Sequence, residues 1–159
     1  MYTAAAANTA FSTLDLADFI GAMGQLPEMA MQNAKWFMSR TAYLESVGRL
    51  AGASGGLTTE VIPEGPSQVM FLGLPVVFVP VLNSTTGAQV STNVLCVGDL
   101  SQTAVLGTRP GLAIASSNQR YLETDSTAIR GTQRFDISIH GTGDASNAES
   151  MIVLATPGS

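Results

Sequence analysis

The sequence predicts an α+β fold in which helices pack on a mixed β-sheet. Two stretches within residues 11–51 place apolar side chains at helical spacing. Residues 61–155 instead contain short apolar segments separated by glycine and proline, which is typical of strands. Residues 135–140 alternate strictly between apolar and polar side chains. Helices followed by a run of strands indicate an α+β architecture.

The first helix is expected soon after Ser12. Ser12 and Asp15 approximate a capping box, and Asp15 and Asp18 place negative charge in the first turn. One inward-facing apolar stripe is predicted, formed by Leu16, Phe19, Ile20, Met23 and Leu26. The opposite side of the helix carries Asp15, Asp18, Ala22 and Gln25. Pro27 ends this helix and suits the start of a short helical turn over residues 28–32.

A buried strand and a second helix are predicted next. Residues 35–38 are aromatic, apolar and few, as in a buried strand. Thr41 is predicted to cap a helix that runs to about Ala51 and is stopped by the glycine cluster at residues 52–56. The residues expected to face inward are Tyr43 or Leu44, Val47 and Leu50.

The remainder of the chain is predicted to form strands and loops. Strands are expected at residues 61–62, 68–72, 76–79, 94–97 and 151–155. Residues 82–93 are polar and predict a flexible loop, and residues 141–148 predict a second one. Segments 103–106 and 112–115 flank a Pro-Gly turn, which predicts a hairpin between them. The alternation in residues 135–140 predicts one wet and one dry strand face.

One contiguous core is expected from these elements. Trp36 is its predicted anchor because it is the only tryptophan and lies in a buried strand. The expected members are Phe19, Ile20, Met23, Trp36, Phe37, Val77, Val79, Leu95, Val97, Ile152 and Leu154.

Composition excludes several classes of function. A chain of 159 residues is normally one domain, and this one is 45% hydrophobic but only 12% charged, about half the usual charged share. So few charges indicate that much of the surface meets other protein. The net charge of −5 argues against a dedicated nucleic-acid binder. A single cysteine cannot form an internal disulfide, and no apolar stretch reaches the length of a membrane helix.

Catalytic-looking fragments have simpler explanations. Residues 52–56 match the pattern G-x-S-x-G, but a nucleophile elbow needs a strand before the serine, whereas a helix is predicted there. His140 is the only histidine and is expected on a polar strand surface. Cys96 is expected to be a small apolar filler in a core strand. Asp15 and Asp18 are explained by helix capping.

Asp99 has two interpretations. It is either part of a plain turn after an apolar strand or a structural carboxylate that pairs with Arg109 or Arg134. Neither interpretation assigns it chemistry. The sequence therefore predicts no catalytic residue, no cofactor-binding residue and no metal ligand, and the chain is not expected to be an enzyme.

Three ordered motifs carry a resemblance to a known family. They are Asn33-Ala34-Lys35-Trp36-Phe37-Met38, then Leu72-Gly73-Leu74-Pro75-Val76, then Gly98-Asp99. In this order and spacing the chain resembles, from about Phe11 to Thr156, the C-terminal half of tailed-phage major capsid proteins of the Hong Kong 97 type.

The resemblance implies a domain organisation. Residues 11–98 and 149–159 correspond to the axial domain, a sheet with packed helices, and residues 99–148 to the long strands of the peripheral domain. Residues 1–10 are expected to be a flexible entry. The family's N-terminal arm, extended loop and spine helix have no counterpart in this sequence, so this chain alone is not expected to close into shells.

The resemblance also implies a function. The chain would be a structural subunit of a phage or prophage icosahedral capsid that self-associates around five- and six-fold axes to enclose the genome. Its location would be the virion, after synthesis in the bacterial host cytoplasm. Its expected partner is itself, with no specific nucleic acid, membrane, small-molecule substrate or cofactor. Loops 52–66 and 82–93 would reach the axis.

Two alternatives remain. The first is the shell of an encapsulin-like compartment, which keeps the fold and encloses cargo enzymes. The second is a small-molecule binding module or an enzyme on an unrelated α+β fold.

Overall fold

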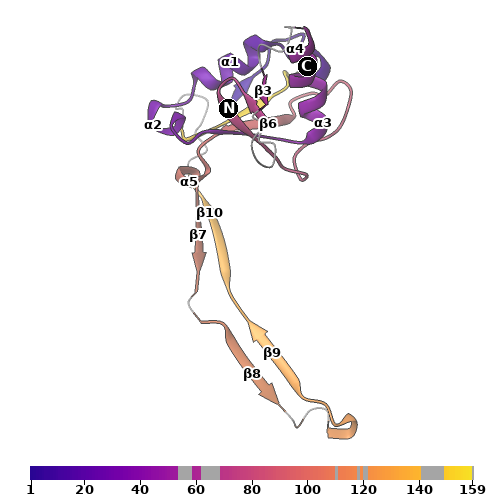
Figure 1. Cartoon of the computed structure of the whole chain (residues 1–159), viewed down its shortest axis with the longest axis vertical. Helices are drawn as coiled ribbons and strands as arrows, with labels where there is room; N and C mark the ends of the chain where they lie inside the picture. The colour runs from indigo at the N-terminus through magenta and orange to yellow at the C-terminus, as the bar shows by residue number, and fades with distance from the viewer. Residues whose placement is uncertain are drawn as a thin grey trace. The chain divides into compact units, whose positions relative to one another are not determined.

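The chain divides into two compact units. The computed structural model describes residues 1–53, 59–61, 69–109, 111–117, 119, 122–140 and 149–158. Unit 1 consists of residues 1–103 and 140–159, and unit 2 of residues 104–139. Both chain ends lie in unit 1 (Figure 1). Both boundaries of unit 2 fall inside segment 99–148, which the sequence predicts to be one region.

Unit 1 is built on a mixed sheet that has seven strands among the described residues, in the order β1-β11-β6-β2-β5-β4-β3. The strands are β1 (Tyr2–Thr3), β2 (Lys35–Met38), β3 (Thr59–Val61), β4 (Val69–Phe71), β5 (Leu74–Phe78), β6 (Asn93–Gly98) and β11 (Met151–Ala155). β1 runs parallel to β11 and β2 parallel to β5, and the other neighbours are antiparallel. The predicted mixed sheet is confirmed.

Helical segments complete unit 1. They are η1 (Phe11–Thr13), α1 (Leu16–Gly24), α2 (Glu28–Met31), α3 (Arg40–Ala42), η2 (Tyr43–Gly48), α4 (Arg49–Ala53) and α5 (Leu100–Thr103). η2 is a π-helical stretch inside the longer predicted helix. Within the described residues, every helix is too short to span a lipid bilayer.

Trp36 anchors the core, as the sequence predicts. Its side chain is fully buried and packs edge-on against Phe19 of α1, with ring centroids 5.7 Å apart. Phe71 of β4 lies 5.6 Å from Trp36 and 5.0 Å from Phe19. The indole N–H donates to the Phe71 carbonyl at 3.1 Å, so the buried polar atom is satisfied. We call Phe19, Trp36 and Phe71 the aromatic triad.

The predicted core includes too many residues, because some of them lie on the face of the sheet opposite Trp36. Strand side chains alternate between faces, so Trp36 is buried while Lys35 is exposed and Phe37 is half-buried. Val77 pairs with Phe37 in register and is half-buried too, as is Val79. The predictions that Phe37, Val77 and Val79 belong to the core are therefore wrong.

Helix α1 begins later than expected and is rotated. Its N-cap is Asp15, whose backbone N–H donates to Asp18 Oδ2 at 3.1 Å, so the pair Asp15–Asp18 replaces the predicted Ser12–Asp15 box. Asp18 is buried because it also accepts from the Ala5 N–H at 3.0 Å. Burying this carboxylate turns Ala22 inward and leaves Ile20 50% exposed, which corrects the predicted stripe.

The first ten residues are part of unit 1 and do not form the predicted flexible entry. β1 adds a parallel strand beside β11, and the Ala4 N–H continues the pairing with the Ala155 carbonyl at 2.9 Å. Ala4 and Asn8 are each only 5% exposed. The edge of β11 and the buried Asp18 carboxylate supply the hydrogen-bond partners that hold this segment.

The second helical stretch starts at Arg40. Ser39, rather than the predicted Thr41, is its cap, because the Ala42 N–H donates to Ser39 Oγ at 3.1 Å. Leu44 is 61% exposed, so Tyr43 takes the inward position. The serine of the G-x-S-x-G pattern lies outside the described residues.

The loop before β6 is tied down, although the sequence predicts a flexible segment over residues 82–93. Gln89 is 9% exposed, and its backbone N–H donates to the Thr9 carbonyl at 2.7 Å. Its side-chain amide donates to the Thr85 carbonyl at 2.6 Å. The Ser91 N–H donates to the Pro157 carbonyl at 3.0 Å. Polar side chains here hold the loop to unit 1.

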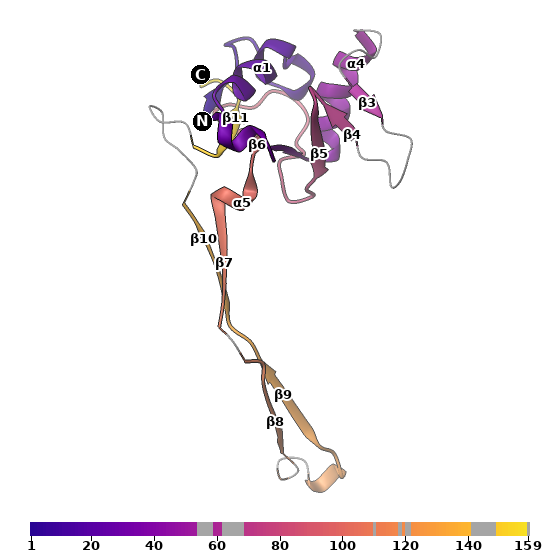
Figure 2. The ribbon, with the colours of Figure 1, turned by 60° about the vertical axis from the view of Figure 1, so that its left-hand side comes forward.

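Unit 2 consists, in its described residues, of two antiparallel ribbons joined along the chain (Figure 2). Its elements are β7 (Ala104–Thr108), β8 (Ala113–Ser117), η3 (Leu122–Thr124), β9 (Ala128–Thr132) and β10 (Phe135–Ile139). β7 pairs with β10, and β8 pairs with β9. The predicted hairpin of residues 103–106 with 112–115 is wrong. Pairing with β10 instead sets Leu106 opposite Ile137, and apolar cross-strand pairs stabilise a ribbon.

Truncation of Trp36 tests the core. We expect Trp36→Ala to lower the free energy of unfolding by about 3–5 kcal/mol, because it removes a buried ring and leaves the Phe71 carbonyl without its donor. Urea unfolding followed by circular dichroism measures this. The matched control Ile20→Ala removes a half-exposed side chain and should cost under about 1 kcal/mol. Equal losses in the two variants would contradict the assigned core.

Candidate functional site

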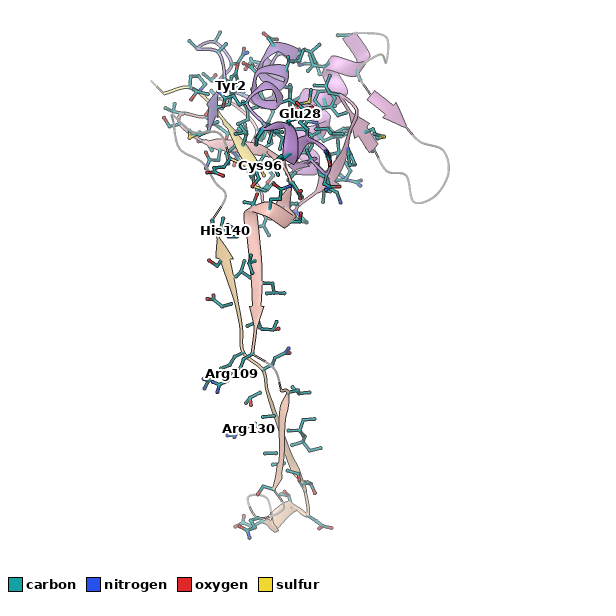
Figure 3. All side chains as sticks on the ribbon, turned by 90° about the vertical axis from the view of Figure 1, so that its left-hand side faces the viewer. Tyr2, Glu28, Cys96, Arg109, Arg130 and His140 are labelled. Atoms are coloured by element: carbon teal, nitrogen blue, oxygen red, sulfur yellow. The ribbon has the colours of Figure 1, made fainter. Side chains whose placement is uncertain are left out.

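The described residues contain no group of three or more His, Cys, Asp or Glu side chains that could hold a metal ion. Cys96 is half-buried on β6, and burial raises the pKa of its thiol to about 11. The thiol therefore stays protonated near neutral pH and is a poor nucleophile. His140 is exposed, as predicted (Figure 3).

An open cleft of about 730 Å³ lies in unit 1, where β2 and β5 begin and β6 ends. Its polar lining includes Asn33, Lys35 and Asp99, and its apolar lining includes Phe37 and Val77. Lys35 is the only lysine of the chain and is exposed. The charged groups of the cleft are the Lys35 ammonium and the Asp99 carboxylate. Whether the cleft could act chemically therefore depends on whether the Asp99 carboxylate already has hydrogen-bond partners.

Asp99 is already fully engaged in structure. Its side chain is 3% exposed and accepts from the Ser101 N–H at 2.9 Å and the Ser101 hydroxyl at 2.7 Å. Gln102 Nε2 donates to the other oxygen at 3.1 Å. The hydrogen bonds from Ser101 lower the pKa of Asp99 and outweigh desolvation, with smaller contributions from Gln102 and Asn33.

Asp99 therefore fixes the turn from β6 into α5. The hydrogen bonds from Ser101 and Gln102 support the turn interpretation, and the alternative pairing with Arg109 or Arg134 stays a prediction. Donors two and three residues away satisfy the carboxylate locally, with no need for a side chain from another segment.

Gly98 is required by a close approach of two strands. Its φ is +152°, and a Cβ atom there would lie 2.2 Å from the Ser150 carbonyl oxygen. The next N–H, from Asp99, donates to that carbonyl at 2.9 Å. The Gly-Asp motif is thus a structural joint between β6 and β11 rather than a reactive site.

Unit 2 exposes a continuous apolar surface on the β7–β10 ribbon. The strand register places one set of side chains on a single face, which we call the apolar ribbon face: Ala104, Leu106, Phe135, Ile137 and Ile139. Leu106, Phe135, Ile137 and Ile139 are each 59–70% exposed. The alternation predicted in residues 135–140 is confirmed, but the face expected to be dry is exposed in unit 2.

The same chemistry continues on the β8–β9 ribbon. Ile114 and Ile129 lie on one face of this ribbon and are 67% and 75% exposed. An isolated two-stranded ribbon is marginally stable in water, and contiguous exposed apolar surface marks an interaction site. Unit 2 therefore carries the strongest protein-binding signal in the described residues.

A basic hollow lies where the two ribbons meet along the chain. It has a volume of about 250 Å³ and is lined by Arg109, Gly111, Ala113, Thr132 and Arg134. The Arg109 N–H donates to the Arg134 carbonyl at 3.1 Å, which fixes the two residues opposite each other. Within the described residues, neither guanidinium group has a hydrogen-bond or ion-pair partner. We call this feature the arginine hollow; Arg109 and nearby Arg130 are labelled in Figure 3.

Sequence reasoning missed the arginine hollow because it missed the strand pairing. Once Thr108 is placed opposite Phe135, Arg109 and Arg134 must flank the next step of the ladder. The sequence feature that could have located the hollow is therefore the apolar alternation of β7 and β10, which sets their pairing.

Comparison with known proteins identifies the family. Residues 1–142 match the family model of the phage capsid family, which is most of the chain. The chain belongs to the phage capsid family. The predicted family and α+β fold class are confirmed, and membership in a capsid family agrees with a structural, non-enzymatic protein.

Two solved capsid structures have a fold similar to that of this phage capsid family member. The capsid of an empty GTA particle matches with a TM-score of 0.59 and 14% identity over 98% of this chain and 49% of that chain. The capsid of a native GTA particle matches with a TM-score of 0.58 and 16% identity over 98% and 48%. The chain thus spans about half the length of these capsid proteins. No curated protein matches it in sequence.

The Asp99 joint predicts how stability depends on pH. Because the folded pKa lies below the unfolded value of about 3.9, the carboxylate stabilises the fold above that pH, and this contribution is lost as pH falls through the folded pKa. We expect Asp99→Asn to cost about 1–3 kcal/mol at pH 7 and to flatten the acid limb of the stability profile.

Denaturant unfolding at a series of pH values measures the effect. Glu28→Gln is the matched control, since Glu28 lies in the same unit, is exposed and has no partner in the described residues. An acid limb that is unchanged in Asp99→Asn would contradict the assigned role.

Proposed function

We propose that this chain is a structural subunit of a phage or prophage icosahedral capsid and self-associates around five- and six-fold axes to enclose the genome. The family match over residues 1–142 carries this proposal. The matched solved chains are themselves capsids, described with C5 symmetry, and share the fold over 98% of this chain.

The apolar ribbon face supports a role in assembly. Its four large side chains are each more than half exposed, which costs solvation free energy that contact with other protein recovers. Each such side chain contributes on the order of 1.5–3 kcal/mol when fully buried. An assembly interface is the simplest use for a surface of this kind.

Charge distribution favours contacts between copies. Unit 1 contains nine acidic residues against three basic ones, whereas unit 2 contains four arginines and three acidic residues. The described residues of unit 2 include Arg109, Arg130 and Arg134, whose guanidinium groups have no partner there. Complementary potentials between copies steer association and fix its register.

Rings require heterologous contacts, in which two different surfaces of one chain meet. We propose that unit 1 is the axial domain and that unit 2 supplies the peripheral strands. The loop before β6 presents Val81, 93% exposed, and Val90, 56% exposed, while hydrogen bonds hold its base. This loop can therefore contact a neighbour at an axis. Most of the other proposed axial loop, residues 52–66, lies outside the described residues.

The remaining parts of the proposal follow from the capsid role. The subunit would reside in the virion after synthesis in the bacterial host cytoplasm. Its partner is a second copy of itself, without a specific nucleic acid, membrane or small-molecule ligand. The family match favours the phage capsid over an encapsulin-like compartment shell and over a small-molecule enzyme on an unrelated fold.

A charge on the apolar ribbon face should disrupt association. We expect Ile137→Asp to weaken self-association at least about tenfold, because a carboxylate would be buried against apolar side chains. Sedimentation velocity over a concentration series measures this. Ser138→Asp is the matched control, since Ser138 lies on the other face of the same strand. Equal weakening by both variants would contradict an interface on this face.

The chain alone should not build complete shells. It spans about half the length of the solved capsid chains, so we expect monomers and small rings stabilised by contacts around a single axis. Light scattering after size exclusion and negative-stain imaging test this. Uniform closed shells formed by this chain alone would overturn the expectation.

A further inference from the structure

We propose that the arginine hollow of one copy binds the acidic turn of a second copy. The acidic turn is residues 122–125, which carry Glu123 and Asp125 between β8 and β9. The proposal rests on the self-association proposed above and assigns one contact within it. Two carboxylates would meet two guanidinium groups.

The hollow is built to receive an anionic group. Arg109 and Arg134 both line a space of about 250 Å³, and their guanidinium groups lack partners in the described residues, so two uncompensated positive charges belong to the lining. Arginine presents a planar fork of N–H donors that matches a carboxylate in two parallel hydrogen bonds. Thr132 adds a hydroxyl to the lining.

The turn presents the matching charges. Glu123 and Asp125 are exposed and, within the described residues, have no hydrogen-bond or ion-pair partner. Asp125 has φ +50°, a conformation that aspartate tolerates better than most residues and that reverses the chain tightly. The Ser126 hydroxyl donates to the Thr124 carbonyl at 3.1 Å and helps to shape the turn.

The ladder within one copy keeps its own turn away from its own hollow. β8 and β9 pair Ala113 with Thr132 at the hollow and Ser117 with Ala128 toward the turn. Four residue steps along a strand span about 13 Å, whereas an ion pair needs about 4 Å or less. Figure 2 shows η3 at the far end of this ribbon from the junction with β7 and β10. The partner must therefore come from another copy.

A carboxylate suits the hollow better than a nucleic-acid phosphate. Nucleic-acid binders carry a broad basic surface, while this chain has a net charge of −5 and unit 2 nearly balances its charges. Exposed Leu112 and Ile114 lie beside the hollow in sequence, at 61% and 67% exposure. Arginine beside apolar side chains is typical of protein–protein interfaces.

Charge reversal on each side tests the contact. One variant carries Arg109→Glu with Arg134→Glu, and the other carries Glu123→Arg with Asp125→Arg. All four side chains are exposed, so both variants should keep the wild-type circular dichroism spectrum. Each variant alone sets like charges together and should self-associate about tenfold more weakly than the wild type.

Mixing the two variants restores opposite charges in both directions. An equimolar mixture should therefore recover near wild-type association by sedimentation velocity, and added salt should weaken it. The matched control Arg130→Glu reverses the same kind of charge in unit 2 at a residue that does not line the hollow, and should change association less than Arg134→Glu.

Three results would overturn the contact. The first is failure of the mixture to recover association while Ile137→Asp still abolishes it, which rejects this contact but keeps the proposed function. The second is a wild-type chain that stays monomeric at every concentration, which rejects both. The third is arginine-dependent binding of a short DNA duplex with self-association unchanged by the reversals, which assigns the hollow to phosphate.

Discussion

The burial of Trp36 between Phe19 and Phe71 is the interaction on which unit 1 depends. It joins a helix and two strands that are distant in sequence, and its N–H reaches the Phe71 carbonyl at 3.1 Å. Because β2 lies in the middle of the sheet, this contact sets which face of β2 is covered. The opposite face then presents the exposed Lys35 and the half-buried Phe37.

Local apolar pattern was enough to locate the central strands and most helices. β2 and β11 coincide with the segments predicted at residues 35–38 and 151–155, because a short buried strand needs little beyond apolar and β-branched side chains. The start of α1 is harder to predict, since its sequence pattern places Asp18 on the solvent side. Its burial depends on donors from Ala5 and Asn8, which an amphipathic pattern does not reveal.

The strand pairing of unit 2 could not be predicted from the local sequence pattern. A proline and a glycine between two apolar segments predict a hairpin, but turn residues permit a reversal without requiring one. Ribbon pairing is instead decided by the partner strand more than twenty residues later, where Leu106 meets Ile137. The arginine hollow inherits this non-local dependence, so the candidate site could not be found until the register was known.

The two units differ in how they treat their polar and apolar groups. In unit 1 the buried carboxylates of Asp18 and Asp99 are surrounded by donors, so the fold satisfies its polar groups internally. In unit 2 large apolar side chains and unpaired guanidinium groups remain at the surface. A ribbon with only two strands cannot bury its own face, whatever its sequence. Burial of the apolar ribbon face against other protein would therefore lower the free energy of unit 2, in line with the assembly role proposed above.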